Sequence, residues 1–155
     1  MIESAVFGVK DESVEYVGRH GAYGVAIRGD TVLIEMARLG YFLPGGGVEA
    51  HETIEHALHR EFAEETGYEI SSIQEIGVAI EYQHDVYKGE SLYVKKVGHF
   101  YLVELGAQSE PTYADGHVYP VVWLPISSVQ EKMYLPSQWW AIERVAHIAE
   151  ISVHP

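Results

Sequence analysis

The sequence predicts an α/β fold, an α/β/α sandwich with a central mixed sheet and a loop followed by a helix between its strands. Segments with strand-like patterns precede and follow one central helical segment. The two β stretches after that helix are long, which favours a mixed sheet, and a second helical pattern ends the chain. Because the chain has 155 residues, 47% of them hydrophobic, we expect a single domain over residues 1–155.

The first part of the chain predicts a hairpin preceded by two edge strands. Gly29 and Asp30 form its two-residue turn, because glycine tolerates positive φ there. A short apolar run at residues 41–44 then leads into the central stretch. The predicted strands are residues 5–9, 14–17, 22–28 and 31–37.

The second part predicts long strands and a closing helix. The predicted strands are residues 70–82, with a bulge at Gly77, residues 91–105, bent near Gly98, and residues 119–124. The polar residues 84–90 and 110–117 indicate loops. Pro125 opens a short helix to about residue 133, and Pro136 begins the last helix. The residues of that helix expected to face the core are Trp139, Ile142, Val145, Ala146 and Ala149.

The central stretch, residues 45–68, joins three glycines to an acidic helix. Gly45, Gly46 and Gly47 let a loop turn sharply and approach phosphates or the helix. The helix is about fourteen residues long and ends at Gly67. On a helical wheel, the face that carries its apolar residues also carries three acids: Glu61, Glu64 and Glu65.

These acids continue the apolar stripe, whereas a solvated charge run lies opposite it. Partly buried carboxylates close together raise each other's pKa and destabilise the fold unless a cation neutralises them. Mg²⁺ prefers carboxylate oxygens, waters and substrate phosphates, and Mn²⁺ is an alternative. The pattern therefore predicts a metal held by Glu61, Glu64 and Glu65, with Arg60 orienting a carboxylate or pairing with Glu52.

The same stretch resembles the signature of a known family. Seven residue types within 22 positions stand at the spacing of the Nudix box of MutT-like Nudix hydrolases: Gly46, Glu52, Arg60, Glu61, Glu64, Glu65 and Gly67. Phe62 fits a bulky position of the box. Tyr68 stands where Ile, Leu or Val is usual, and His51 stands where many members carry Gly.

The resemblance implies a Nudix-type sandwich and a Mg²⁺-dependent hydrolase. Its substrate would be a nucleoside diphosphate linked to another moiety, as in nucleoside triphosphates, nucleotide sugars or dinucleotides. A metal-activated water would attack phosphorus, and the general base is left open. A noncatalytic Nudix-like nucleotide sensor is the alternative, although every acid of the box is present. The implied catalytic set is Glu52, Arg60, Glu61, Glu64 and Glu65.

Substrate contacts are expected from the glycine run and from side chains near the sheet. The predicted contacts are Gly45, Gly46, Gly47, Arg38 and Phe42. Tyrosines and arginines on or near predicted strands are further candidates: Tyr23, Tyr82, Tyr101, Tyr119, Arg19 and Arg28. Several family members carry one more acid shortly before a tryptophan. Trp123 is preceded by valines, which leaves Glu110, Asp115 and His117 as the nearest polar residues.

Charge limits the expected partners. The chain has 23 acidic and 10 basic residues, a formal charge of −13, which repels long nucleic acids and anionic membranes. A small phosphorylated substrate needs a bound metal to reverse this field locally. Without cysteine there is no disulfide or thiolate chemistry, and with no membrane span or secretory leader the cytoplasm is expected. A homodimer is left open, because many relatives pair.

Overall fold

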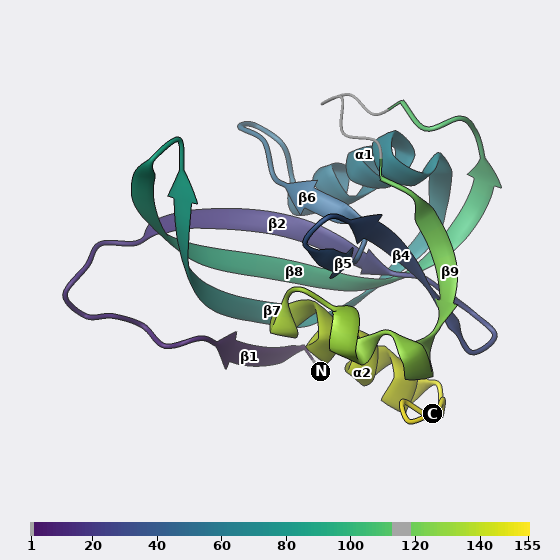
Figure 1. Ribbon diagram of the computed structural model, residues 1–155. Helices are drawn as coiled ribbons and strands as arrows, with labels where there is room; N and C mark the ends of the chain where they lie inside the picture. The colour runs from purple at the N-terminus through teal and green to yellow at the C-terminus, as the bar shows by residue number, and fades with distance from the viewer. Residues whose placement is uncertain (1, 113–118) are drawn as a thin grey trace.

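The computed structural model describes residues 2–112 and 119–155, with two sheets and two α-helices in this part of the chain (Figure 1). The larger sheet has the order β1-β7-β8-β2-β6 and the smaller one is centred on β4. The strands of the larger sheet are β1 (Glu3–Phe7), β2 (Val17–Val25), β6 (Gly45–Gly47), β7 (Tyr68–Tyr87) and β8 (Glu90–Gln108). Those of the smaller sheet are β3 (Ile27–Arg28), β4 (Thr31–Ala37), β5 (Gly40–Phe42) and β9 (Val121–Pro125). The helices are α1 (Ile54–Thr66) and α2 (Pro136–Ile148), with short 3-10 turns at Ile126–Ser128 and Gln130–Lys132.

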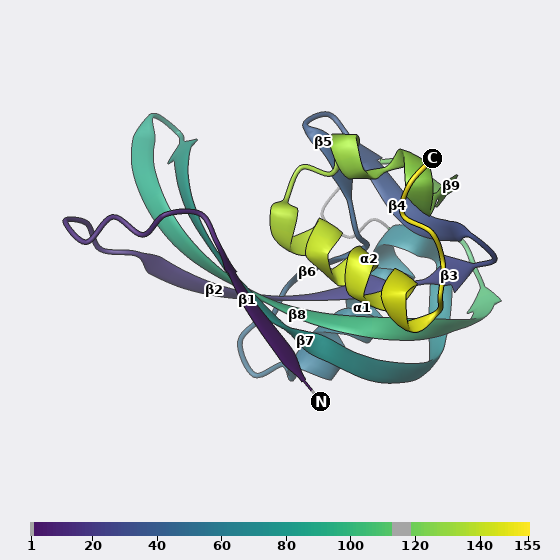
Figure 2. The same ribbon diagram turned by 90° about the horizontal axis from the view of Figure 1, so that it is seen from below.

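The larger sheet is mixed, and the helices cover its two faces. Strands β1 and β7 pair in parallel, as do β2 and β8, whereas β7 and β8, and β2 and β6, are antiparallel. Helix α1 and helix α2 lie on opposite faces of this sheet (Figures 1 and 2). One apolar cluster surrounds Phe62 of α1, and another surrounds Ile142 of α2. The predicted α/β/α sandwich with a mixed sheet is confirmed.

A predicted turn and a predicted bulge have the expected geometry. Strands β3 and β4 pair through Arg28 and Thr31 across the Gly29 turn, where Gly29 has φ 62°. The register of β7 shifts between Glu75 and Gly77, which is the predicted bulge. The sequence pattern therefore located this turn and this bulge, whereas the register shifts between Tyr68 and Ile70 and between Ile70 and Ser72 were not predicted.

The predicted loop at residues 84–90 is wrong. Strands β7 and β8 stay paired up to Tyr87 and Glu90, and the turn consists of Lys88 and Gly89 at φ 51° and 81°. The polar residues are compatible with a strand because this end of the hairpin extends beyond the helices (Figure 1). The long hairpin forms one wall of the cavity described below.

Four further predictions are corrected. Residues 14–16 are not a strand, because Asp11 accepts hydrogen bonds from Ser13 and forms a turn there. The glycine run is the strand β6 and not a loop, since it pairs with β2. The predicted helix after Pro125 consists of two 3-10 turns. Ala149 is exposed because α2 ends at Ile148.

Candidate active site

Helix α1 is capped at both ends and packs closely on the larger sheet. Its N-cap, Thr53, accepts a hydrogen bond from the His56 N–H at 3.1 Å, and Gly67 ends it in the left-handed conformation at φ 75°. Phe62 is fully buried, and a Cβ on Gly24 of β2 would lie 2.5 Å from its ring. This contact sets how closely the acidic helix approaches the sheet.

His51 lies in the loop two residues before the N-cap of α1, and its backbone is in the left-handed conformation that glycine adopts at little cost. Its φ is 66°, in the left-handed region that costs a non-glycine residue about 1 kcal/mol or more. Tyr68, the other unusual residue of the box, packs edge to face on Trp123 with ring centroids 6.4 Å apart. Tyr68 therefore makes a packed aromatic contact, whereas His51 carries local backbone strain.

Arg60 is the centre of the hydrogen-bond network on this helix. Its Nε and Nη2 donate to the two carboxylate oxygens of Glu52 at 2.6 and 2.9 Å, as the sequence predicted. Nη2 also donates to the Gly47 carbonyl at 3.0 Å, which joins the helix to β6. Nη1 lies 3.0 Å from Glu61 and 3.2 Å from Glu64. Arg60 therefore holds Glu52 and touches two of the three predicted metal ligands.

Two of the three glycines are required by close approaches. A Cβ on Gly46 would lie 2.5 Å from a carboxylate oxygen of Glu61, which is only 8% exposed. Gly45 has φ 145°, its Cβ would collide with the Ala22 carbonyl, and its N–H donates to Glu65 at 3.2 Å. Around Gly47 a Cβ would meet no described atom within 4 Å. The run thus places two glycines against the acids and one in the open.

Glu35 is a member of the site that sequence reasoning missed. It lies on β4, opposite Phe42 of β5, and forms a hydrogen bond with Glu65. Burial raises the pKa of Glu65 well above its ordinary range, helped by Glu35 and Glu61 and opposed by the Gly45 N–H. A signal was present: Glu35 is the one charged residue in the strand sequence TVLIEMA.

The donor set fits a hard divalent cation. Within residues 2–112 and 119–155 no three acidic or histidine side chains already form a metal cage. Arg60 Nη1 occupies the space between Glu61 and Glu64 instead. On the other side Glu65 meets Glu35 and accepts a hydrogen bond from the Gly45 N–H, and carboxylate oxygens are the ligands that Mg²⁺ prefers. The predicted inward placement of the three acids is therefore observed.

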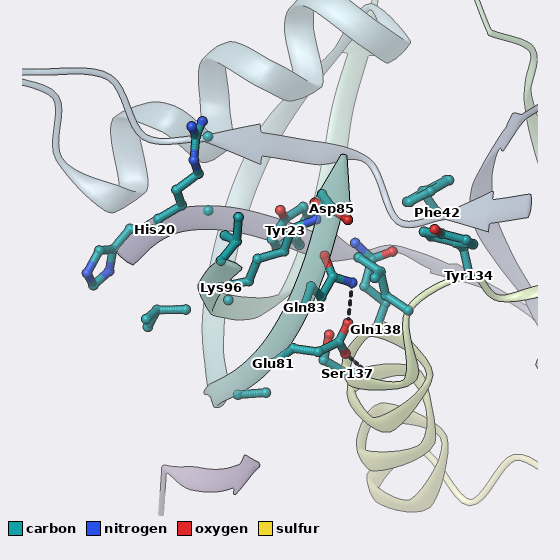
Figure 3. Close-up of a pocket in the computed structure, with 18 of the residues that line it drawn as sticks. His20, Tyr23, Phe42, Glu81, Gln83, Asp85, Lys96, Tyr134, Ser137 and Gln138 are labelled. Atoms are coloured by element: carbon teal, nitrogen blue, oxygen red, sulfur yellow. Dashed lines mark hydrogen bonds between the residues drawn. The ribbon is translucent and has the colours of Figure 1, made fainter. Parts of the chain in front are cut away.

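A cavity of about 840 Å³ lies beside the Gly47 end of β6 (Figure 3). Tyr23 and Gly47 line it, and so does Phe42, which lies beside Tyr134 with ring centroids 5.4 Å apart. Burial, and then the charges of Glu65, Glu61 and Glu81, raise the pKa of Tyr23 to about 12. Tyr23 thus stands between the acidic helix and the cavity.

The remaining candidates lie in different places. Arg19 lines the cavity, whereas Arg38 is exposed in the β4–β5 turn and is not among its lining residues. Arg28 lies over the Trp123 ring at 4.1 Å. Glu110 is exposed, and Asp115 and His117 fall outside the described residues.

Three of the tyrosines proposed for stacking lie away from the cavity lining. Tyr82 packs edge to face on Tyr16 with ring centroids 5.0 Å apart. Tyr101 is 7% exposed and belongs to the cluster under α1. Tyr119 precedes β9, outside the cavity lining. Of the predicted aromatic contacts, Tyr23 and Phe42 therefore remain near the site.

Solved structures share this fold. A MutT NUDIX hydrolase from Burkholderia pseudomallei has 20% identity and a TM-score of 0.65, with 83% of this chain and 98% of that chain covered. A NUDIX hydrolase from Nitrosomonas europaea has 18% identity and a TM-score of 0.64, with 90% and 93% covered. A structure described as an ADP compounds hydrolase has 14% identity and a TM-score of 0.62, with 85% and 73% covered. The curated proteins contain no match to this chain.

The protein has an α/β/α sandwich fold in which an acidic helix packs against the glycine strand β6. Fold and site together indicate a hydrolase. The NUDIX domain model matches residues 18–145, and the chain belongs to the Nudix family. It is a Nudix pyrophosphohydrolase, of a family that acts on small nucleotide substrates and generally uses divalent metal ions. Within the described part of the chain, no helix is long and apolar enough to cross a membrane.

Proposed function

We propose that this protein is a Mg²⁺-dependent hydrolase of a phosphoanhydride bond in a nucleoside triphosphate, nucleotide sugar or dinucleotide, with Mn²⁺ as an alternative ion. The observation that carries the proposal is the group of inward-facing acids on α1 beside the glycine strand. Glu61 is buried against Gly46, and Glu65 is held by the Gly45 N–H and meets Glu35. Such a group needs a cation, and a pyrophosphate brought there would be repelled without one.

In this proposal Glu61, Glu64 and Glu65 hold the metal through their carboxylate oxygens. The bound ion would lower the pKa of a water and neutralise charge on the phosphates. Glu52 and Arg60 position the helix face through their paired hydrogen bonds and the bond to Gly47. Gly45 and Gly46 bring the β6 backbone close to the acids, and Gly47, which lines the cavity, leaves room for a phosphate beside them.

The reaction is the in-line displacement of one phosphate by water. The water oxygen forms a bond to phosphorus, the bridging P–O bond breaks, and the leaving phosphate takes its electron pair. A carboxylate of the acidic group accepts the water proton. Phe42 supports the nucleoside side of the substrate from the cavity wall. The contact proposed for Arg38 would require a substrate that reaches the β4–β5 turn.

A hydrolysis assay tests this function. Nucleoside triphosphates, nucleotide sugars and dinucleotides are incubated with the protein in Mg²⁺, and phosphate or nucleotide products are measured. We expect turnover of at least one class, lost in EDTA, and a fall of about 100-fold or more in kcat for Glu64→Gln.

Glu55→Gln is the matched control, because Glu55 lies on the same helix, is exposed and belongs to its first turn. It should keep kcat within about twofold. Binding without product from every class would favour the sensor alternative, and full turnover by Glu64→Gln would remove the catalytic assignment. A homodimer and a cytoplasmic location stay predictions.

A further inference from the structure

The cavity contains a glutamine whose amide orientation is dictated by the backbone. Gln138, at the start of α2, is 1% exposed and lines the cavity (Figure 3). The Leu43 N–H lies 2.7 Å from its side-chain oxygen. Because a backbone N–H can only donate, the atom facing Leu43 must be the oxygen. The Nε2 of Gln138, a pure donor, therefore faces the other way.

The amide of a second glutamine is oriented by an acceptor instead of a donor. Gln83 of β7 lines the same cavity, and its Nε2 donates to Glu81 at 3.0 Å. The other oxygen of Glu81, which is 4% exposed, accepts from the Ser137 N–H at the start of α2. With both Glu81 oxygens engaged as acceptors, Gln83 must present its nitrogen to Glu81. Its own oxygen is left as an acceptor.

We propose that Gln138 is a specificity-determining residue that donates, through Nε2, to an acceptor in the plane of the substrate's nucleobase. Gln83 Oε1 accepts from a donor on the same base. Amide groups that are already held by a second partner lose little conformational freedom when the substrate binds. A mismatched base would leave one of these buried polar groups unpaired, which lowers affinity. Phe42 and Tyr134 supply an aromatic wall of the same cavity. This inference rests on the proposed function, because it assumes that the cavity takes the nucleoside part.

The test is a donor-to-acceptor exchange that keeps the fold. Gln138→Glu retains an oxygen for the Leu43 N–H and replaces Nε2 with an acceptor. Binding of ADP, GDP, CDP and UDP in Mg²⁺ is measured by calorimetry, so turnover is not needed. We expect the wild type to discriminate among the four by at least tenfold in Kd. In Gln138→Glu the ratio between the best and worst ligand should change by at least tenfold.

Gln130→Glu is the matched control, because Gln130 is exposed on a 3-10 turn and gains the same charge away from the cavity. Its Kd ratios should equal those of the wild type. Equal binding of all four diphosphates by the wild type would overturn the proposal. So would a uniform loss of affinity in Gln138→Glu, because that is repulsion of phosphate and not base recognition. Binding to none of them would overturn it too.

Hydrolysis by wild type and Glu64→Gln tests the proposed function separately from these ratios. Turnover with unaltered base ratios in Gln138→Glu would leave the hydrolase intact and remove only the role of Gln138. Protection of the Leu43 amide from hydrogen exchange should match between wild type and Gln138→Glu. Lost protection together with altered ratios would assign the effect to a disturbed strand end and overturn the recognition role.

Discussion

At the scale of single residues, the contact of Gly46 with Glu61 ties the glycine strand to the acidic helix. Gly46→Ala places a methyl group 2.5 Å from the Glu61 oxygen, so that the carboxylate must move. We expect kcat to fall about 100-fold, since displacements near 1 Å at a reacting centre have such effects. Gly18→Ala of β2 is the control, because its Cβ would meet no described atom within 4 Å and Gly18 is not among the residues that line the cavity. Steady-state kinetics of the pair check this, and equal activity of the two variants would contradict it.

Glu52 makes stability depend on pH through Arg60. The hydrogen bond from Arg60 lowers the pKa of Glu52 from 4.5 to about 2. A carboxylate with a lowered folded-state pKa stabilises the fold above its unfolded pKa and loses that contribution as pH falls toward the folded value. The free energy of unfolding of wild type should therefore exceed that of Glu52→Gln above about pH 4.5. The difference should shrink between pH 4.5 and 2.

Urea unfolding at several pH values measures this difference. Glu49→Gln serves as the control, because Glu49 is 70% exposed and lies 3.9 Å from Arg60. We expect it to change stability little at any pH, as is usual for exposed ion pairs. A gap between wild type and Glu52→Gln that stays constant down to pH 2 would show that the Arg60 bond does not set this titration.

At the scale of elements, the position of helix α1 depends on the absence of a side chain on β2. Gly24→Ala would press a methyl group against the Phe62 ring at 2.5 Å and Val103 at 3.1 Å. Overpacking of this kind typically costs about 1–3 kcal/mol in unfolding free energy. Because α1 carries the acids, kcat should fall as well. Chemical denaturation and kinetics of the variant measure both effects.

Gly18→Ala on the same strand is the matched control, since its Cβ would meet no described atom within 4 Å. Alanine in a strand there should be neutral or stabilise by up to about 1 kcal/mol. Were the two variants equally stable, the closeness of helix and sheet would not depend on Gly24.

At the scale of the whole molecule, a net charge of −13 makes the folded state sensitive to cations. If Mg²⁺ binds only the folded state, a concentration 100 times Kd adds roughly 2.7 kcal/mol of stability. For a chain of this size that corresponds to a Tm rise of about 5–10 °C. Thermal unfolding in MgCl₂, compared with NaCl at equal ionic strength, measures the specific part.

The specific rise should be strongly reduced in Glu61→Gln, whose side chain keeps its size but loses the charge. Glu12→Gln is the control for overall charge, because Glu12 is exposed and lies in the β1–β2 connection, outside helix α1. An identical Tm in the two salts for wild type would mean that the stabilisation is screening alone.

The local features of the site were predictable from the sequence, because they depend on the spacing along one helix. The period of 3.6 residues puts Glu61, Glu64 and Glu65 on the apolar face, and Arg60 pairs with Glu52 as expected. Gly29, Gly67 and Gly77 likewise mark a turn, a helix end and a bulge. Each of these features depends only on residues that are close to it in the sequence.

Only the tertiary structure decided which distant residues meet. Glu35 reaches Glu65 because β4 lies beside the acidic helix, and the Gln138 amide is oriented by Leu43, 95 residues away. The loop predicted at residues 84–90 became a paired hairpin because its partner strand lay across a two-residue turn. The polarity of a segment does not show whether its backbone is paired in a sheet. Pairing between distant strands cannot be predicted from a short stretch of sequence. The acids of the box were therefore readable from the chain, whereas the cavity was built by folding.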